Sequence, residues 1–147
     1  MKSLSAAPSR APIEVHDDQW AGRSHADKRA DVAAWLAERH ADAVVIAALD
    51  SVAWLLNIRG RDVPRTPVAL AFVIAHKDGS VDLFADPAKI TPALRAHLGD
   101  AVRCQPRDGF AAALKEMTGQ TVVADPQSCV AAIFDALDAG GAKIVEA

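Results

Sequence analysis

The chain has 147 residues, 51% of them hydrophobic and 24% charged, which fits one globular domain and excludes a wholly disordered polypeptide. Sixteen lysines and arginines against nineteen aspartates and glutamates give a net charge of -3, which excludes a strongly basic nucleic-acid-binding protein. The longest apolar runs, at 43–49 and 68–75, are far shorter than the roughly 20 residues of a membrane-spanning helix. Two cysteines without metal-binding spacing, and an N-terminus without an apolar signal core, favour a cytoplasmic protein.

The first 23 residues differ from the rest of the chain. Prolines, serines and a glycine interrupt this stretch, and no helical or strand period is visible, so 1–23 is predicted to be a linker or arm. Ile13, Val15 and Trp20 leave a second interpretation open, in which the stretch connects two domains and packs on one of them. Regular structure is expected to begin at the α/β domain over 24–147.

A helix, a strand and a short helix are predicted next. Ser24 begins a capping-box-like sequence ahead of an amphipathic helix over 25–40. The run 43–48 is apolar on both faces and β-branched in its middle, which predicts a central strand of a sheet covered by helices. The pair Asp50-Ser51 is expected to cap a short helix over 52–56.

A hairpin and an alternation of helices and strands complete the pattern. The runs 68–76 and 80–85 flank an Asp-Gly turn and predict two antiparallel strands. The sequence as a whole predicts an α/β fold with a mixed, largely parallel sheet of about six strands, one central β-hairpin and helices on both faces. The later elements are expected as a helix starting at Thr91-Pro92, a strand near 101–105, a helix near 108–117, a strand at 121–124, a helix over 128–139 and a strand at 142–146.

The sequence contains no local catalytic or metal-binding motif. Its five histidines follow no metal-ligand spacing, and no glycine-rich phosphate loop or GxSxG nucleophile elbow is present. Cys129 stands at a predicted helix start, but a small buried apolar side chain explains it better than a reactive thiolate. We therefore expect no catalytic residue, no metal ligand and no cofactor in this chain.

The segment 50–67 stands apart because it holds a tryptophan, arginines, aspartates and prolines between two buried strands. Loops at strand ends are where α/β domains carry function. On the pattern alone, a rigid connecting turn in which Arg59 and Asp62 pair for stability is an equally open interpretation.

The same segment carries a family resemblance. The run ALDSVAWLLNIRGRDV at 48–63, followed by Pro67-Val68 and the hairpin, resembles the middle domain of three-domain Xaa-Pro aminopeptidases of the creatinase/prolidase family. WAGRS at 20–24 and FADPAKI at 84–90 are similar to segments on either side of that motif, and the resemblance covers 17–146. It implies the creatinase N-terminal domain fold, with a ribonuclease H-like layout.

The resemblance implies an accessory domain rather than a catalytic one. The family removes the N-terminal residue that precedes a proline, in a C-terminal domain whose two divalent metal ions, expected to be manganese, are held by two Asp, one His and two Glu. None of these ligands maps onto this chain, so the chain alone is expected to be inert. The implied partners are the first and catalytic domains of the same parent, which can be homodimeric, and a proline-containing peptide.

The resemblance also suggests roles for four residues as substrate-cleft or docking candidates. Arg59 and Arg61 are expected to hold carboxylates of the peptide or of the catalytic domain, and Asp62 to orient an arginine or approach the substrate ammonium. Trp54 is expected to form an apolar wall, although packing in the core is the favoured interpretation for it. The alternative to the accessory domain is a free-standing α/β ligand-binding or protein-interaction module.

Overall fold

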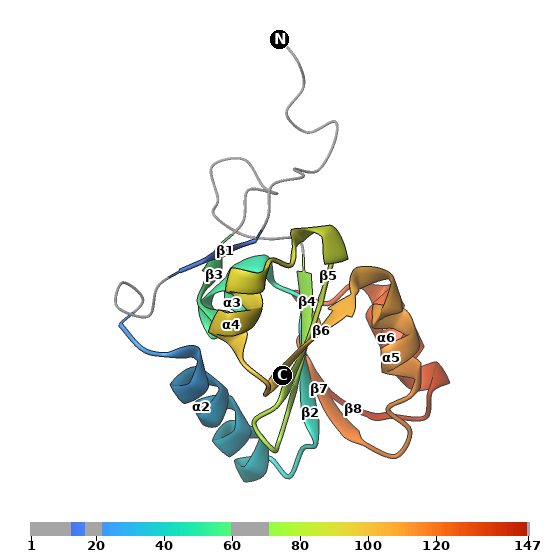
Figure 1. Ribbon diagram of the computed structural model, residues 1–147. Helices are drawn as coiled ribbons and strands as arrows, with labels where there is room; N and C mark the ends of the chain where they lie inside the picture. Colours follow the sequence, from blue (N-terminus) through green and yellow to red (C-terminus); the bar gives the residue numbers. More distant parts are fainter. Residues whose placement is uncertain (1–12, 17–21, 60–70, 147) are drawn as a thin grey trace.

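Two sheets organise the part of the chain that the computed structural model describes, which is residues 13–16, 22–59 and 71–146. The larger sheet has six strands in the order β6-β5-β4-β2-β7-β8, and the smaller one pairs β1 with β3 (Figure 1). The strands are β1 (Glu14–Val15), β2 (Ala43–Ile46), β3 (Ile58–Arg59), β4 (Ala71–His76), β5 (Val81–Ala85), β6 (Val102–Pro106), β7 (Thr121–Ala124) and β8 (Lys143–Glu146).

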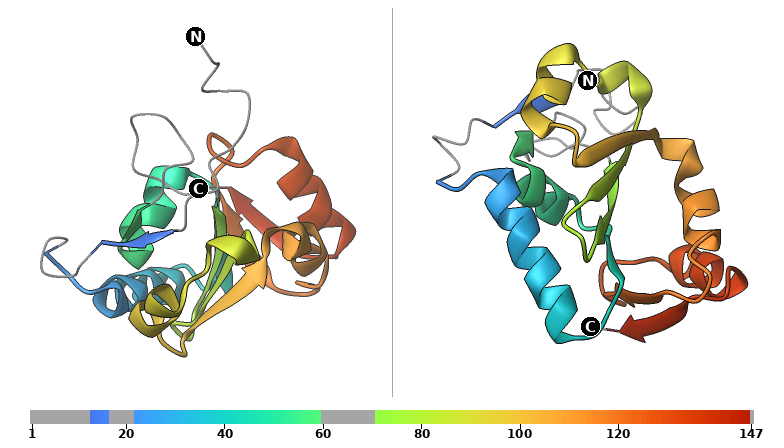
Figure 2. Two further views of the ribbon diagram at one scale, coloured as in Figure 1. Left: turned by 45° about the horizontal axis from the view of Figure 1, so that its top comes forward. Right: turned by 60° about the horizontal axis from the view of Figure 1, so that its bottom comes forward.

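Helices cover both faces of the larger sheet. Figures 1 and 2 show α2, α3 and α4 on one face and α5 and α6 on the other. None of the helices in the described residues is long and apolar enough to cross a membrane. The helices are α2 (His25–Glu38), α3 (Leu49–Leu56), α4 (Pro92–Leu98), α5 (Phe110–Lys115) and α6 (Ala131–Ala139), with short 3-10 turns η1 (Pro87–Lys89) and η2 (Arg107–Gly109).

The direction of the strands agrees with the predicted mixed, largely parallel sheet. β4 runs antiparallel to both of its neighbours, β5 and β2, while the pairs β5–β6, β2–β7 and β7–β8 are parallel. Five strands therefore point the same way and β4 alone opposes them. β2 lies inside the sheet between β4 and β7, as its two apolar faces predicted, and the predicted hairpin is β4–β5.

Two hydrophobic layers hold the helices to the sheet, because successive strand side chains point to opposite faces. On the α2–α3–α4 face, Val73 and Leu83 pack with the helix leucines Leu55 and Leu94. On the α5–α6 face, residues of the same strands pack against helix residues such as Leu137. Each layer includes residues from three or more strands. Packing against several strands fixes the positions of the helices, and with them the ends of the loops that join helices to strands.

The start of α3 differs from the prediction. The helix begins at Leu49 with Ala48 as its N-cap, and the Val52 N–H already donates to the Ala48 carbonyl. Asp50 therefore lies in the first turn, where its carboxylate accepts from the Ser51 N–H, and the expected capping by Asp50-Ser51 is wrong. A negative side chain in the first turn interacts favourably with the helix dipole. Asp50 is therefore compatible with a helix that begins one residue before it.

The expectation that regular structure begins at Ser24 is also wrong. Glu14 and Val15 form β1, which pairs antiparallel with β3. Ile13 is only 3% exposed in the core, and its N–H donates to the Lys89 carbonyl. Ser24 does cap α2, because its hydroxyl accepts from the Asp27 N–H at 3.1 Å, as predicted. Trp20 lies outside the described residues.

Candidate functional site

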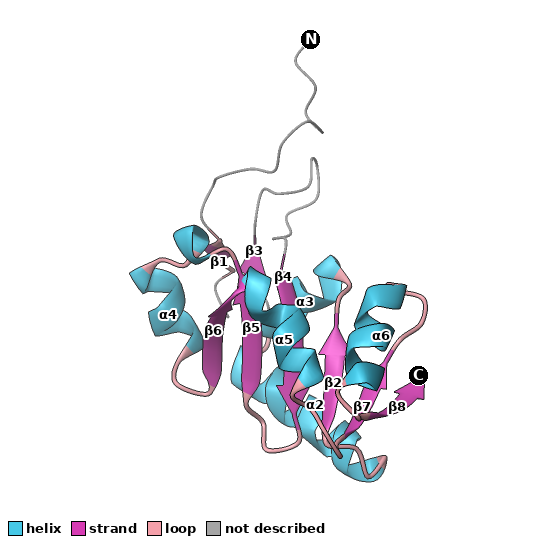
Figure 3. Cartoon of the chain, turned by 90° about the vertical axis from the view of Figure 1, so that its right-hand side faces the viewer, coloured by secondary structure: helices cyan, strands magenta, loops and turns pink. Residues whose placement is uncertain are grey.

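The carboxyl edge of the sheet is the part of the fold where sequence and structure concentrate distinctive residues. The five parallel strands end there, α3 begins there after β2, and β4 starts there at Ala71 opposite Ala85 (Figure 3, upper edge). The carboxyl ends of parallel strands are where open α/β sheets bind ligands. The segment 60–70 lies between β3 and β4 in the sequence, and the strand that follows it, β4, starts at this edge.

Three of the four residues predicted from the sequence belong to this segment or border it. Arg59 lies in β3, where it is the register partner of Glu14, and its side chain is outside the description. Arg61 and Asp62 lie outside the described residues. The roles expected for Arg59, Arg61 and Asp62, and the pairing of Arg59 with Asp62, therefore remain predictions.

Trp54 occupies the outer face of α3, and the interpretation that it packs in the core is wrong. It is 54% exposed, whereas Val52, Leu55 and Leu56 of the same helix are almost completely buried. Helical periodicity explains the difference, since these three share the inward stripe and residue 54 falls on the opposite side. The Lys28 Nζ lies 4.5 Å from the centre of the Trp54 ring, within range of a cation–π interaction.

A buried lysine fixes the end of α3. The Lys28 side chain is 3% exposed, and its Nζ donates to the Trp54 carbonyl at 2.8 Å and to the Asn57 Oδ1 at 2.6 Å. Asn57 takes the left-handed conformation that ends the helix, with φ 53°, and its Nδ2 donates to the Arg23 carbonyl. A cation here satisfies carbonyls that the helix end leaves unpaired.

Two histidines form a second connection at the same place. His25 Nε2 donates to the His97 carbonyl at 2.7 Å, and its Nδ1 accepts from the Arg29 Nε at 3.1 Å. His97 Nε2 in turn donates to the Leu56 carbonyl at 2.9 Å. A carbonyl can only accept and a guanidinium can only donate, so these contacts assign His25 the neutral form with hydrogen on Nε2.

The sequence analysis missed this junction of α2, α3 and α4. Lys28 stands four residues before Val32, on the same face of the helix. A charged residue at an inward-facing position was therefore the signal in the sequence that could have indicated this junction. The junction holds no ligand-binding side chain of its own. Its effect is to fix the path of the chain from α3 into β3, and hence the position of the Arg59 backbone.

A groove opens beside the junction, between α2 and α3. We call it the Trp54 groove; its volume is about 440 Å³, and it is lined by Val32, Ile46, Leu55 and Trp54, with Asp50 and Ser51 exposed at its rim. Its lining is mainly apolar, and its one large exposed side chain is an aromatic ring. Such a surface suits an apolar group better than a charged one.

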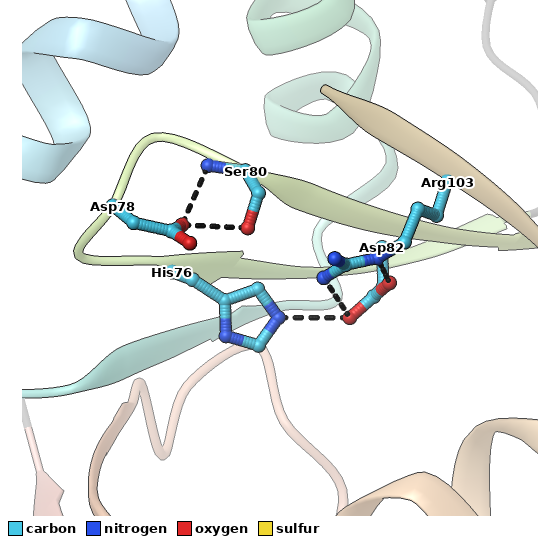
Figure 4. A network of polar contacts seen from close by, with 5 residues as sticks. All are labelled: His76, Asp78, Ser80, Asp82 and Arg103. Carbon is cyan, nitrogen blue, oxygen red and sulfur yellow. Dashed lines mark hydrogen bonds and ion pairs between the residues drawn. The ribbon is translucent and has the colours of Figure 1, made fainter. Parts of the chain in front are cut away.

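A polar cluster lies at the opposite edge of the sheet, around the β4–β5 turn (Figure 4). The Asp82 carboxylate accepts from His76 Nε2 at 2.8 Å and from Arg103 Nε at 2.6 Å. Burial alone would raise the pKa of Asp82, but the hydrogen bonds from His76 and Arg103 hold it well below its usual range. Asp78 closes the turn by accepting from the Ser80 N–H and hydroxyl.

This cluster connects the hairpin to β6 rather than presenting free groups to a ligand. Each partner of Asp82 comes from a different strand, since His76 ends β4 and Arg103 belongs to β6. Ion pairs of this kind perturb pKa values without catalysis. We therefore assign the cluster a structural role.

The described residues do not fit a dinuclear metal site. No group of three or more His, Cys, Asp or Glu among them could hold a metal ion. Burial also raises the pKa of both thiols, Cys104 and Cys129, which keeps them protonated at neutral pH. The described residues therefore supply neither a metal site nor a reactive thiolate.

The fold defines the class of protein: an α/β domain on a mixed six-stranded sheet with helices on both faces. Residues 5–147 match the family model described as the Creatinase/Prolidase N-terminal domain, and the chain belongs to that family. The resemblance found in the sequence is thereby confirmed.

Curated relatives are similar to this chain over only part of their own length. A probable Xaa-Pro aminopeptidase P of Aspergillus niger is 38% identical over 112 residues, which make up 76% of this chain and 18% of the relative. Another of the same description, from Coccidioides posadasii, is 38% identical over 109 residues, 74% of this chain and 18% of the relative. The chain spans less than a fifth of the length of these relatives.

Solved structures share the fold. An X-prolyl aminopeptidase from Caenorhabditis elegans, described as a cytosolic enzyme with a di-nuclear active site, superposes with a TM-score of 0.81 at 24% identity, over 98% of this chain and 25% of that one. The N-terminal domain of a metallopeptidase from Corynebacterium diphtheriae, solved as a separate chain, gives 0.63 at 19% identity, over 84% of this chain and 95% of that one. Domains of this type can therefore fold alone.

Proposed function

We propose that this chain is the accessory middle domain of an Xaa-Pro aminopeptidase, a metallopeptidase that removes the N-terminal residue preceding a proline. The observation that carries the proposal is the 38% identity over 112 residues to a probable Xaa-Pro aminopeptidase P. That similarity occupies 18% of the relative, which leaves room for separate catalytic and first domains. It favours an accessory domain over a free-standing binding module.

The chemistry in this proposal belongs to a catalytic domain of the same parent. Two divalent metal ions, which we propose to be manganese, would activate water for attack on the bond before proline. The di-nuclear active site and cytosolic location of the C. elegans enzyme support both the metal pair and a cytoplasmic location. A homodimeric parent is part of the same proposal.

The contribution of this domain is to shape the substrate cleft. Arg59 and Arg61 would bind carboxylates through paired N–H donors, and Asp62 would orient one of them or meet the substrate ammonium. Trp54, which is exposed on α3, is available either as an apolar wall of the cleft or as a docking residue. The division into an arm over 1–23 and a domain from 24 onward is part of this proposal, with Ile13 anchored in the core of the domain.

The activity test compares the full-length parent with the 147-residue chain. Both are incubated with an Xaa-Pro peptide and Mn²⁺, and release of the N-terminal residue is measured. We expect the parent to be active and to lose its activity with a chelator, and the chain alone to be inert. Metal-dependent release by the chain alone, or a parent without such activity, would refute the proposal.

A further inference from the structure

The Trp54 groove is an apolar surface that this domain leaves open among its described residues. Trp54 is 54% exposed although it stands beside buried Leu55, and the groove next to it has apolar walls from α2 and β2. An exposed tryptophan beside an apolar groove is typical of a protein–protein contact, where this residue is enriched at energetically dominant positions.

We propose that the Trp54 groove is the docking site for the catalytic domain of the same polypeptide, which inserts an apolar side chain between α2 and α3. The proposal rests on the function proposed above. It names one occupant, and it makes Trp54 a docking residue that contacts the catalytic domain rather than the peptide substrate.

The strand register places the carboxyl end of β8 close to the groove. Glu146 pairs with Ala124, and Ala124 pairs with Val45, which directly precedes the groove residue Ile46. Adjacent strands are about 4.8 Å apart, so Glu146 lies roughly 10 Å from the strand that forms the groove wall. β8 and β2 are both parallel to β7, so β8 ends at the carboxyl edge, where α3 begins with the rim residues Asp50 and Ser51.

The charges at the rim specify the chemistry of the occupant. Asp50 is exposed at the rim, and its carboxylate accepts only the neighbouring Ser51 N–H among the contacts described here. The Lys28 ammonium is turned inward to the Trp54 and Asn57 oxygens. The complementary occupant is therefore an apolar side chain with a lysine or arginine beside it.

The ring is also held in place before docking. Lys28 lies over the ring of Trp54 and binds its carbonyl, so both the side chain and the end of α3 are fixed. A preorganised aromatic surface loses little conformational entropy on binding, which favours docking.

Hydroxyl-radical footprinting tests the proposal on the 147-residue chain and on the full-length parent, both at low concentration. A ring that goes from 54% exposed to about a tenth exposed should be oxidised about fivefold more slowly in the parent. In the parent, Trp54→Ala should also speed proteolysis of the segment after Ala147, on the order of tenfold. The control Val130→Ala removes an apolar side chain that is 65% exposed at the N-cap of α6, across the sheet, and should not change the proteolysis rate.

Four results would overturn the docking proposal. These are equal oxidation of Trp54 in both proteins, protection of Trp54 when the isolated chain is concentrated, protection only after a proline peptide is added, and no effect of Trp54→Ala on proteolysis. The second would indicate a second copy as the occupant, and the third would indicate substrate. A parent that lacks aminopeptidase activity would instead refute the proposed function, and this is measured separately from the footprint.

Discussion

Lys28 shows how much one side chain can determine at the edge of this fold. Its ammonium is buried and binds two oxygens at the end of α3, the Trp54 carbonyl and the Asn57 Oδ1. Burying a charge is costly unless it is paired and hydrogen-bonded, so the lysine and its acceptors stabilise the fold only together. Removing the ammonium alone leaves buried oxygens without their donor.

We expect Lys28→Met to lower the free energy of unfolding by about 2 kcal/mol, because hydrogen bonds to charged groups are worth about 1.5–3 kcal/mol each and methionine keeps the apolar stem. Urea unfolding of the isolated chain measures this. Lys77→Met is the matched control, since Lys77 is an exposed lysine paired with Asp42. An equal effect of the two substitutions would contradict the role assigned to Lys28.

Arg59→Ala separates the two interpretations of Arg59, which are carboxylate binding and pairing with Asp62. If Arg59 binds a carboxylate of the substrate or catalytic domain, kcat/KM of the parent for a proline peptide should fall by about tenfold to a hundredfold, equivalent to ~1.5–3 kcal/mol. The melting temperature should change little. If Arg59 instead pairs with Asp62 for stability, the melting temperature falls and the folded enzyme keeps its kinetics.

At the scale of elements, the β4–β5 hairpin and β6 are joined through one carboxylate. Asp82 accepts from His76 of β4 and from Arg103 of β6, so its ionised form connects three adjacent strands. The pKa of Asp82 is lower in the folded state than in the unfolded chain, where it takes the usual value near 4. The stabilisation is present above about pH 4 and is lost as the pH falls below it.

Asp82→Asn should therefore cost about 1–2 kcal/mol at pH 7, where two charge-assisted bonds are weakened at a partly exposed site. The difference in stability between wild type and variant should shrink steadily between about pH 5 and pH 2, because the wild-type carboxyl becomes protonated. Denaturant unfolding across that pH range measures it. A difference that is independent of pH would show that the carboxylate charge is not what connects the strands.

Elements with a local signal could be predicted from the sequence, and those that depend on distant partners could not. The apolar run of β2 and the Asp-Gly turn between β4 and β5 carry their own patterns. β1 has two residues, too few to show a period, and 42 residues separate it from its partner β3. The segment around Trp54 identified the candidate site, but α3 is apolar on most sides, so only its packing shows that Trp54 faces outward.

At the scale of the whole molecule, the core includes Ile13, which lies in the sequence ahead of α2. Ile13 is buried with Leu94 and Leu98 of α4 and with residues of β5, and its N–H binds the Lys89 carbonyl. Val15, two residues later in the same segment, is 37% exposed. Ile13 therefore fills a place in the packed core that Val15 does not fill.

Ile13→Ala is expected to destabilise the isolated chain by about 2–4 kcal/mol, the usual cost of removing a large buried aliphatic side chain. Val15→Ala, a comparable change two residues later in β1, should cost well under half as much because Val15 is partly exposed. Thermal unfolding of both variants makes the comparison. Similar melting temperatures for the two would indicate that the arm contributes no core packing.

The pairing of β1 with β3 makes a ribbon of two segments that are far apart in the sequence. Glu14 is held opposite Arg59, and His16 is tied to Asn57 through its backbone N–H. A pull or twist applied to the chain ahead of Ile13 would thus be delivered directly to the strand that carries Arg59. The ribbon therefore links the N-terminal part of the chain mechanically to the strand that carries Arg59.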